Sequence, residues 1–351
     1  MQVYPNISVQ TELAHPHDLL TRYFLIDQEL FTCLLEYYGG SQVIHLFDLR
    51  SLRCESPTSI DDNLQEVIGD LRFSAHFKTG GYSKIFFFFE HQSKKVKRFC
   101  IRCLRKLLEF YENCDANPEN FITNDGKFPY IFVIVLYHGK IPWEELLQIS
   151  DLVSLPPEVD QHFLSFPAIL IDLSQIHSEL LTGHPALVAL LDTLQSASLG
   201  VLPENFDRII GHLEKIKTDS RIHGWLNSLT RYSLAVSKIS KEVVTETISK
   251  ILNKKEAKKM VTSTMEELFL KGEAKGEAKG EAKGRIEGRI EGEARGKIQS
   301  VLRILDKKFK KVPKSIVRSV SSYTDVIALD SLFESALDCK TLEEFKQELV
   351  K

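Results

Sequence analysis

Two carboxylates on either side of a glycine-containing turn could together bind a divalent cation, and an amide beside one of them could orient a water molecule. Asp70 precedes the turn segment Lys78–Ser83, which contains two consecutive glycines, and Glu90 and Gln92 follow it. If the flanking segments pair as antiparallel strands, position 70 lies opposite position 90 or 91, and opposed side chains are about 5 Å apart. Because side chains alternate between the faces of a strand, Gln92 would share the face of Glu90.

Opposed carboxylates of this kind suit metal-dependent hydrolysis of a phosphodiester. Mg²⁺ prefers oxygen ligands, and a bound cation neutralises a phosphate and activates water for attack. Glu90 ends the run Phe86–Phe89, where an ionised carboxylate is costly unless a cation or a hydrogen-bond donor pairs it. The alternative is an ordinary pair of acids on a hairpin, which is a common arrangement. The apolar surroundings of Glu90 favour the metal site.

Basic residues follow these carboxylates at once. Residues 94–106 contain seven lysines and arginines and no acid. A helix is predicted over 95–113, where spacings of three and four residues would place a stripe of cations on one face. The stripe consists of Lys95, Arg98, Arg102 and Arg105. It could hold DNA phosphates, or it could be a solvated helix face, although solvated faces usually mix charges of both signs.

The elements expected around these residues indicate a mixed α/β sheet followed by helices. Strands are predicted over 65–77, 84–91, 130–138 and 168–173, with a candidate short strand at 42–49. Apolar residues at both parities in the second and third of these segments indicate strands that are buried on both faces. Helices are predicted over 17–38, 179–196, 203–217 and 226–270, and again after residue 298. Strands separated by a helix or a long connection are typical of an α/β core.

The composition limits the class of protein. The chain has 351 residues, room for roughly two domains, and 43% of the residues are apolar. The formal charge of −3 gives no global basic excess, so a nucleic-acid partner must be bound by a local patch. No signal peptide opens the chain, and no apolar run approaches the roughly 20 residues that span a bilayer. We therefore expect a soluble, cytoplasmic protein with no membrane partner.

The six cysteines are sparse and irregularly spaced, which argues against a secreted disulfide scaffold. Cys100 and Cys103 form a C-x-x-C pair, but no second C-x-x-C or C-x-x-H accompanies it. The pair is either half of a zinc site or two small residues on the apolar side of a helix, and the missing second pair favours the helix.

Several motifs occur together in an order found in a known family. They are Pro16-His-Asp18, Gly69-Asp-Leu-Arg72, Phe89-Glu-His-Gln-Ser93, Ile101-Arg-Cys-Leu-Arg105, Ile134-Val-Leu-Tyr-His-Gly139 followed by Trp143, and Leu170-Ile-Asp-Leu-Ser174. With these motifs the chain resembles, over roughly residues 15–300, the bacterial Rpn family of recombination-promoting nucleases, which are also named transposases of the PD-(D/E)xK type.

The resemblance implies a restriction-endonuclease-like mixed sheet flanked by helices, and cleavage of DNA that depends on Mg²⁺, with Ca²⁺ or Mn²⁺ as other cations. It also implies a link to recombination. By position, Asp70 and Glu90 are the metal ligands, and Gln92 stands where the wider superfamily has lysine. His17 and Asp18 open the family's N-terminal helix motif and are expected to support the site.

Gln92 differs from a lysine at that place in one respect. An amide donates a hydrogen bond but brings no positive charge to the negative charge that develops on the phosphate. Lys94 shares the parity of Glu90 and Gln92 if the strand continues, and it could supply that charge.

Glycine recurs at every fourth position through residues 271–297, where the tetrad Lys-Gly-Glu-Ala later changes to Gly-Arg-Ile-Glu. Glycine costs about 1 kcal/mol per helical position, and like charges four residues apart do not stabilise a helix. Two interpretations remain. Helices of a homodimer could pack closely here, with a Glu stripe facing a Lys stripe, or the segment could be a flexible low-complexity spacer.

We therefore expect four regions. They are a PD-(D/E)xK-like nuclease domain over 1–175, a helical region over 176–270, the repeat segment 271–297 and a C-terminal helical segment 298–351. The predicted function is a metal-dependent DNA endonuclease linked to recombination or to a mobile-element-like process. The alternative is a catalytically weak or inactive DNA-binding or assembly protein that keeps the nuclease fold.

Overall fold

The structure is a computed structural model, and it describes most of the chain from residue 15 to residue 349. The described residues are 15–40, 44–55, 71–79, 85–92, 98–118, 126–144, 149, 152–154 and 168–349, with the backbone alone described for 85–92, 275, 278, 279 and 282. The chain divides into two compact units, 1–270 and 271–351, each of which is described here by itself.

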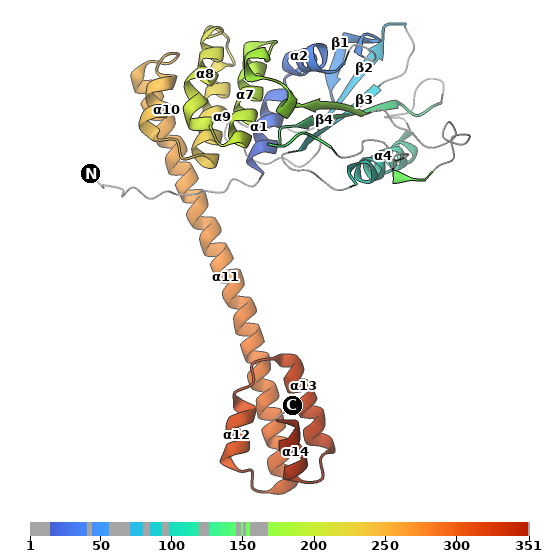
Figure 1. The fold of residues 1–351 in the computed structure, drawn as a ribbon, viewed down its shortest axis with the longest axis vertical. Coiled ribbons are helices and arrows are strands. Elements are labelled where there is room, and N and C mark those ends of the chain that lie inside the picture. The colour runs from blue at the N-terminus through green and yellow to red at the C-terminus, as the bar shows by residue number, and fades with distance from the viewer. Residues whose placement is uncertain are drawn as a thin grey trace. The chain divides into compact units, whose positions relative to one another are not determined.

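The first unit contains a five-stranded mixed sheet (Figure 1). Its strands, in spatial order, are β1 (Phe47–Cys54), β2 (Arg72–Phe77), β3 (Ile85–Gln92), β4 (Tyr130–Tyr137) and β5 (Ala168–Asp172). The first three strands are antiparallel neighbours, and β3, β4 and β5 are parallel neighbours. The mixed α/β class predicted from the sequence is confirmed. The candidate strand at 42–49 is displaced, because β1 begins at Phe47 and continues to Cys54.

Strand β4 is buried on both faces, as its apolar run predicts. Ile131, Val133, Val135 and Tyr137 pack on one face with helix α4 (Phe99–Ala116). The alternate residues Phe132, Ile134 and Leu136 belong to the larger core on the opposite face. Cys100 and Cys103 lie buried on the α4 side of this arrangement with free thiols, as expected for small residues on the apolar side of a helix.

The predicted helix over 17–38 is in fact two helices, α1 (Pro16–Leu25) and α2 (Gln28–Tyr38). Asp27 separates them, because its carboxylate accepts hydrogen bonds from the backbone N–H groups of Glu29 at 3.0 Å and Leu30 at 3.4 Å. An aspartate in this position is a favoured helix N-cap, since it pairs N–H groups that the first helical turn leaves unbonded. The prediction of one helix was therefore wrong at Asp27.

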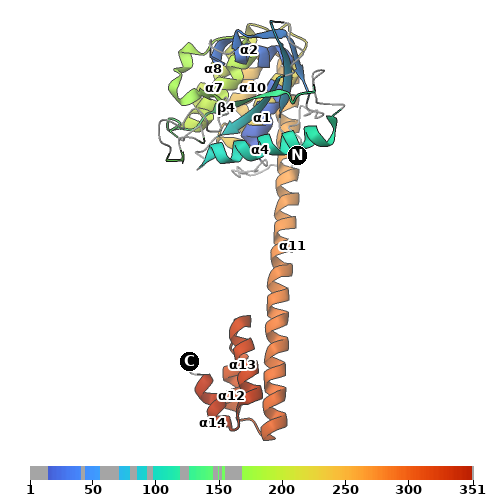
Figure 2. The same ribbon diagram turned by 90° about the vertical axis from the view of Figure 1, so that its right-hand side faces the viewer.

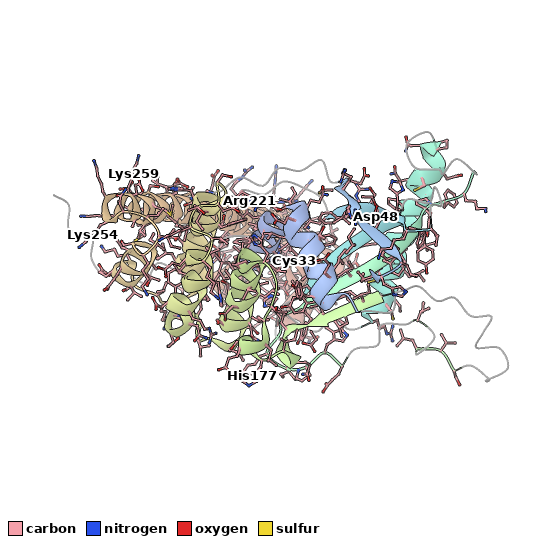
Figure 3. All side chains as sticks on the ribbon, turned by 90° about the horizontal axis from the view of Figure 1, so that it is seen from above. Cys33, Asp48, His177, Arg221, Lys254 and Lys259 are labelled. Atoms are coloured by element: carbon pink, nitrogen blue, oxygen red, sulfur yellow. The ribbon has the colours of Figure 1, made fainter. Side chains whose placement is uncertain are left out.

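A layer of helices follows the sheet and shares its core. Two short 3₁₀ turns, Leu173–Gln175 and Ser178–Leu180, lead into α7 (Pro185–Leu199), α8 (Leu202–Glu214), α9 (Ile222–Val236) and α10 (Lys241–Ile248). Leu190 of α7 and Phe206 of α8 are fully buried in the same cluster as Phe73 and Ile134 of the sheet. The predicted long helix from 226 is interrupted, because Ser240 begins α10 as its N-cap. Figure 3 shows these helices beside the sheet, with Asp48 on β1 and Cys33 on α2.

Helix α11 (Lys254–Phe309) contains the whole repeat 271–297 and leads into α12 (Lys314–Ser321), α13 (Val326–Asp338) and α14 (Leu342–Glu348). The three short helices gather around the C-terminal end of α11 (Figures 1 and 2). The second unit has its own core, which includes Val301, Leu305, Ile316, Val320 and Leu329. Within the described part of the chain, no helix is both long and apolar enough to cross a membrane.

Candidate active site

The predicted metal and catalytic residues fall partly on a central strand and partly outside the described residues. Glu90 and Gln92 lie on β3, where Glu90 pairs with Val135 of β4 and Gln92 pairs with Tyr137. On the other side of β3, Arg72 of β2 pairs with Phe88. Asp70, Lys94 and Lys95 lie outside the described residues, as do the side chains of Glu90 and Gln92.

The strand register relates positions 90 and 92 to a face of the sheet. Residues that pair across neighbouring strands share a face, and successive residues alternate between faces. The partners Val135 and Tyr137 both pack with α4. Positions 90 and 92 therefore have the parity of the face that α4 covers.

Helix α4 carries two of the four cations predicted as a phosphate-binding stripe, Arg102 and Arg105. The helix begins at Phe99, and Arg98 is its N-cap with a left-handed φ of 54°. Arg98 therefore precedes the helix, and the predicted continuous helical stripe from 95 to 105 is wrong at this point. Arg102 lies over the Phe99 ring, 5.1 Å from its centroid, and is partly buried, whereas Arg98 and Arg105 are exposed. Their contact with phosphate stays a prediction.

Hydrogen bonds join the segments that follow β4 and β5 at the carboxyl ends of these strands. The Tyr137 hydroxyl donates to the carbonyl of Ile141 at 2.6 Å. Asp172, the last residue of β5, accepts the backbone N–H of Trp143 at 2.8 Å and that of Ser174 at 2.9 Å. The motif that ends at Trp143 and the motif Leu170–Ser174, which are separate in the sequence, therefore meet at Asp172. The sequence interpretation missed Asp172, although an aspartate directly after an apolar strand and two residues before a serine is a turn signal.

Two histidines and a tyrosine from three segments meet on the face opposite α4. Nδ1 of His17 on α1 lies 2.6 Å from the hydroxyl of Tyr232 on α9. The ring centroid of His138, which directly follows β4, is 4.9 Å from that of His17. His138 Nδ1 donates to the carbonyl of Leu194 on α7 at 3.3 Å. His138 is thus a strand-end histidine satisfied by backbone, the interpretation preferred over a general base.

Both histidines are neutral in the folded protein at pH 7. Burial lowers the pKa of His138 to about 3, with a smaller contribution from the adjacent His17 ring and an opposing one from the Leu194 carbonyl. Burial also lowers the pKa of His17. The hydroxyl of Tyr232 is buried, which raises its pKa. The cluster joins α1, α7, α9 and the end of β4 without any charge.

His17 and Asp18, expected to support the site, have different local partners. His17 contacts Tyr232 and His138, as described above. The carboxylate of Asp18 pairs with Arg22 one helical turn later, at 2.9 Å from Nε. Tyr232 was not singled out from the sequence, because nothing in its surroundings on α9 distinguishes it from a core aromatic residue. A supporting role for His17 and Asp18 stays a prediction.

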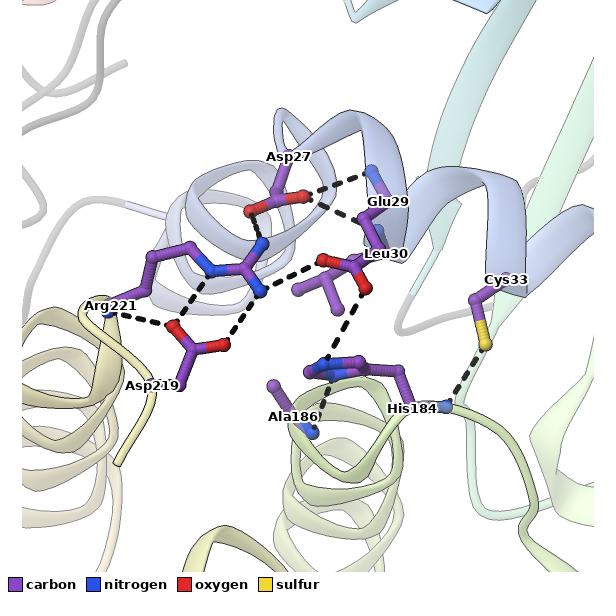
Figure 4. A network of polar contacts seen from close by, with 8 residues as sticks. All are labelled: Asp27, Glu29, Leu30, Cys33, His184, Ala186, Asp219 and Arg221. Atoms are coloured by element: carbon purple, nitrogen blue, oxygen red, sulfur yellow. Dashed lines mark hydrogen bonds and ion pairs between the residues drawn. The ribbon is translucent and has the colours of Figure 1, made fainter. Parts of the chain in front are cut away.

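A second polar cluster lies at the N-terminal ends of α2, α7 and α9 (Figure 4). The guanidinium of Arg221 donates to Asp27 at 2.7 Å, to Glu29 at 2.8 Å and to Asp219 at 2.7 Å. Its plane also covers the Trp225 ring, 4.8 Å from the centroid. Hydrogen bonds from Arg221 lower the pKa of Asp219 to about 2. The cluster joins elements whose residues are 194 positions apart, and this indicates a structural task.

Neither polar cluster is a metal site. Among the residues whose side chains the structure describes, no group of three or more histidine, cysteine, aspartate or glutamate side chains is arranged to hold a metal ion. The predicted ligands, Asp70 and the side chain of Glu90, are not among them. The metal site therefore stays a prediction from the strand register and the residue types.

Known proteins similar to this chain are named as recombination-promoting nucleases. Recombination-promoting nuclease RpnA of Escherichia coli (strain K12) is 29% identical over 184 residues, which are 51% of this chain and 59% of the relative. RpnD of Escherichia coli O157:H7 is 27% identical over 186 residues, 51% of this chain and 66% of the relative. The "Inactive recombination-promoting nuclease-like protein RpnE" of strain K12 is 23% identical over 188 residues, 53% of this chain and 60% of the relative.

The similarity to these curated relatives covers about half of this chain and less than two thirds of their own lengths. No solved structure gives a significant match. Residues 15–222 match the family described as "Putative transposase, YhgA-like". Because this match covers more than half of the 351 residues, the chain belongs to that family. The motifs of the sequence indicate the same relationship through their resemblance to those of the Rpn nucleases.

Proposed function

We propose that this protein is a metal-dependent DNA endonuclease in which Asp70 and Glu90 bind the cation. The observation that carries the proposal is the antiparallel register of β2 with β3, in which Arg72 pairs with Phe88. The same register, continued by two residues, would pair position 70 with position 90. Opposed residues share a face at about 5 Å, a separation at which two carboxylates can bind one cation.

The arrangement of the sheet supports a restriction-endonuclease-like core. An antiparallel hairpin, β2–β3, is followed by α4 and by the parallel strand β4. Glu90 and Gln92 lie on the central strand of this unit, near its carboxyl end. Relatives named as nucleases match over half of this chain, which agrees with DNA as the substrate.

The donor set fits Mg²⁺, because carboxylate oxygens are the hard ligands that this cation prefers, and Mn²⁺ or Ca²⁺ would use the same ligands. A bound cation would supply neutralisation of the phosphate and activation of water. Gln92 would orient the reacting groups through its amide, and Lys94 would supply the positive charge that Gln92 lacks. The exposed cations Arg98 and Arg105, with Arg102 beside them, would contact the DNA backbone from the α4 face.

The proposal is tested by nicking of a supercoiled plasmid by the full-length chain with Mg²⁺. The wild type is expected to nick, and Asp70→Asn and Glu90→Gln are expected to lose at least 100-fold in rate, about 2.7 kcal/mol at roughly 1.4 kcal/mol per factor of ten. Gln92→Lys is expected to nick faster than the wild type. Arg53→Gln on the edge strand β1 is a charge-changing control. Equal nicking by the wild type and Asp70→Asn would refute the site.

A catalytically weak DNA-binding protein is the second candidate function. Two observations favour it. One relative of similar coverage carries the name of an inactive nuclease-like protein, and Gln92 brings no charge to the site. In this case the wild type retards a DNA duplex on a native gel without nicking a plasmid in Mg²⁺ or Mn²⁺, and Gln92→Lys does not restore nicking.

A homodimer is proposed through the repeat 271–297. The glutamates of the repeat are exposed on α11, and at its C-terminal half the charges pair within the helix, as in Lys283 with Glu287 at 3.6 Å. A second copy would pair the glutamates of the N-terminal half with lysines. Sedimentation velocity is expected to give a dimer mass that falls to the monomer when Glu273, Glu277 and Glu281 are replaced by lysine. A monomeric wild type at 50 μM, a concentration of order 10⁻⁵ M, would contradict the dimer.

A further inference from the structure

The C-terminal unit concentrates positive charge at one end. From residue 307 to residue 324 the sequence contains six lysines and arginines and no acid. This stretch covers the last turn of α11, the connection that follows it and all of α12. In contrast, every acid of the unit that follows this stretch lies on α13, on α14 or beside them. These are Asp325, Asp330, Glu334, Asp338, Glu343, Glu344 and Glu348.

One of the six cations has a structural task. The ammonium of Lys308 donates to the carbonyls of Ala336, Leu337 and Cys339 at the end of α13. A lysine there satisfies carbonyls that the last helical turn leaves unbonded and interacts favourably with the helix dipole. Lys308 therefore stabilises the end of α13 and is not counted among the cations that could bind a partner.

The other five cations form an exposed group that we call the basic end. It consists of Lys307, Lys310, Lys311, Lys314 and Arg318. All five are exposed, and none has an ion pair with a described residue. The nearest acids in sequence are Asp306 on α11 and Asp325 before α13, and neither is paired with the basic end.

The fold gathers these residues at a bend between two helices. Lys310 directly follows α11 in a left-handed conformation with a φ of 59°, and Pro313 precedes the first turn of α12. Lys314 and Arg318 are four residues apart and lie on one side of α12, while Ile316 and Val320 are buried on the other. The chain therefore reverses direction within a few residues and brings the end of α11 and the start of α12 together (Figures 1 and 2).

The N-terminus of α12 adds to the positive potential of this bend. No side chain caps its first N–H groups, and no acid occupies its first turn. Free N–H groups at the start of a helix and the helix dipole both attract anions. Since this contribution is small, the charge of the basic end carries the argument.

We propose that the basic end binds the phosphate backbone of a nucleic acid without regard to base sequence. Cations that contact phosphates release condensed counterions, which is the main source of such binding. The patch contains no exposed large hydrophobic residue, whereas α13 exposes Ile327 and Leu337. Protein interfaces use apolar and aromatic residues at their centre, so a purely cationic patch suits a polyanion better than a protein partner. The basic end would hold DNA in addition to the proposed active site.

The test uses the full-length chain and a fluorescein-labelled 24-base-pair duplex in EDTA, so that cleavage cannot interfere. Anisotropy titrations between 50 and 200 mM salt, a range over which phosphate contacts change affinity strongly, give the dissociation constant and its salt dependence. The variant Lys310→Gln/Lys311→Gln/Lys314→Gln removes three cations of the basic end. The control Lys254→Gln/Lys258→Gln/Lys259→Gln changes the net charge equally at exposed lysines on the first turns of α11 (Figure 3).

The basic-end variant is expected to bind at least tenfold more weakly than the wild type, with a salt slope smaller by about 2–3, since each phosphate contact contributes about 0.9. The control is expected to stay within about twofold of the wild type. Unchanged binding by the basic-end variant overturns the proposal, as does an equal loss in the control. If the variant instead changes only the mass in sedimentation velocity, the basic end binds the acidic helices of a second copy, and the proposal is wrong.

The outcome is separable from that of the proposed active site. Binding in EDTA does not depend on a bound cation, so the loss in the basic-end variant is measured without a contribution from the proposed metal site. A chain that binds through the basic end but never nicks DNA would support this proposal and contradict the nuclease. If the wild type nicks DNA in Mg²⁺ and the basic-end variant binds the duplex in EDTA as tightly as the wild type, the nuclease is supported and this proposal is contradicted.

Discussion

Tyr137, His138 and Gly139 lie at the end of strand β4 and have three different roles. The Tyr137 hydroxyl reaches forward to the carbonyl of Ile141, on the α4 side. His138 turns to the other face and donates to the carbonyl of Leu194. Gly139 leaves room for the Tyr137 ring. The sequence shows these residues as a motif, and their division between two faces follows from the alternation of the strand. The partner of His138, Leu194, lies 56 residues away and could not be predicted.

Gly139 is required by the tyrosine two residues before it. A Cβ at position 139 would lie 1.9 Å from the Tyr137 hydroxyl oxygen. We expect Gly139→Ala to displace Tyr137 and to lower the free energy of unfolding by about 1–3 kcal/mol. Gly211→Ala on α8 is the matched control, because nothing lies within 4 Å of its Cβ. That change is expected to stabilise by about 0.5–1 kcal/mol. Urea denaturation measures both, and equal effects would contradict the packing.

His138 makes the protein sensitive to acid. Its pKa is lowered from 6.5 to about 3 in the folded state, so between these values the unfolded chain binds more protons. The stabilisation from keeping His138 neutral is therefore complete above pH 6.5 and is lost as the pH falls through that window. At about 1.4 kcal/mol per pH unit, roughly 2 kcal/mol is lost by pH 5.

His138→Gln removes this titration and is expected to reduce the loss of stability between pH 7.5 and pH 5 by roughly 2 kcal/mol. His17, whose pKa burial also lowers, still titrates in the variant. His223→Gln, at an exposed position of α9, is expected to leave the loss as in the wild type. Urea unfolding at the two pH values gives the difference. The same acid loss in His138→Gln and the wild type would show that His138 is not the titrating group.

At the scale of elements, the strands were predictable and the helix boundaries were less so. Long apolar runs identify β3 and β4, because few other structures bury both parities of a segment. The break at Asp27 was missed because apolar residues continue at helical spacing on both sides of it. The start of α4 was missed because the basic residues before Phe99 suit a helix equally well. In both cases the helix boundary is set by the residue at the N-cap, and the periodicity of apolar residues does not indicate where that residue lies.

Arg221 joins the N-terminal ends of α2 and α9 and offers a test of how they are held. Arg221→Met keeps much of the side-chain volume but removes its ion pairs with Asp27, Glu29 and Asp219. Because the guanidinium is partly exposed, we expect a loss of about 1–2 kcal/mol in the free energy of unfolding. Lys241→Met is the control, since Lys241 and Glu242 form an exposed pair at 3.9 Å. Equal changes of the melting temperature in the two variants would contradict a stabilising role of the Arg221 ion pairs.

At the scale of the whole molecule, the helices after β5 belong with the sheet. Leu187 of α7, Phe206 of α8 and Leu226 of α9 lie in one core with strand residues. The sequence predicts these helices from their spacing, but spacing does not tell which surfaces meet. The family match also continues through this region, to residue 222. The predicted boundary near residue 175 stays a prediction, and the shared core provides its test.

A chain of residues 1–270 is expected to fold cooperatively, because it contains the whole first unit. A chain of residues 1–175 keeps α1 and α2 but lacks α7, α8 and α9, so the core that contains Phe73 and Ile134 loses much of its cover. Exposure of such a core is expected to cause aggregation or a loss of near-ultraviolet circular dichroism. Cooperative melting of both chains would support a separate domain that ends near 175.

The proposed active site is tested most directly by the rate of plasmid nicking as a function of Mg²⁺ for the wild type and Glu90→Gln. Both proteins must first show equal binding of DNA in EDTA, so that a difference in rate reports the reaction alone. We predict Mg²⁺-dependent nicking by the wild type and at least a 100-fold slower reaction in Glu90→Gln, a difference of about 2.7 kcal/mol. Nicking by Glu90→Gln at the wild-type rate, or by the wild type in EDTA, would contradict a metal-dependent site at Glu90.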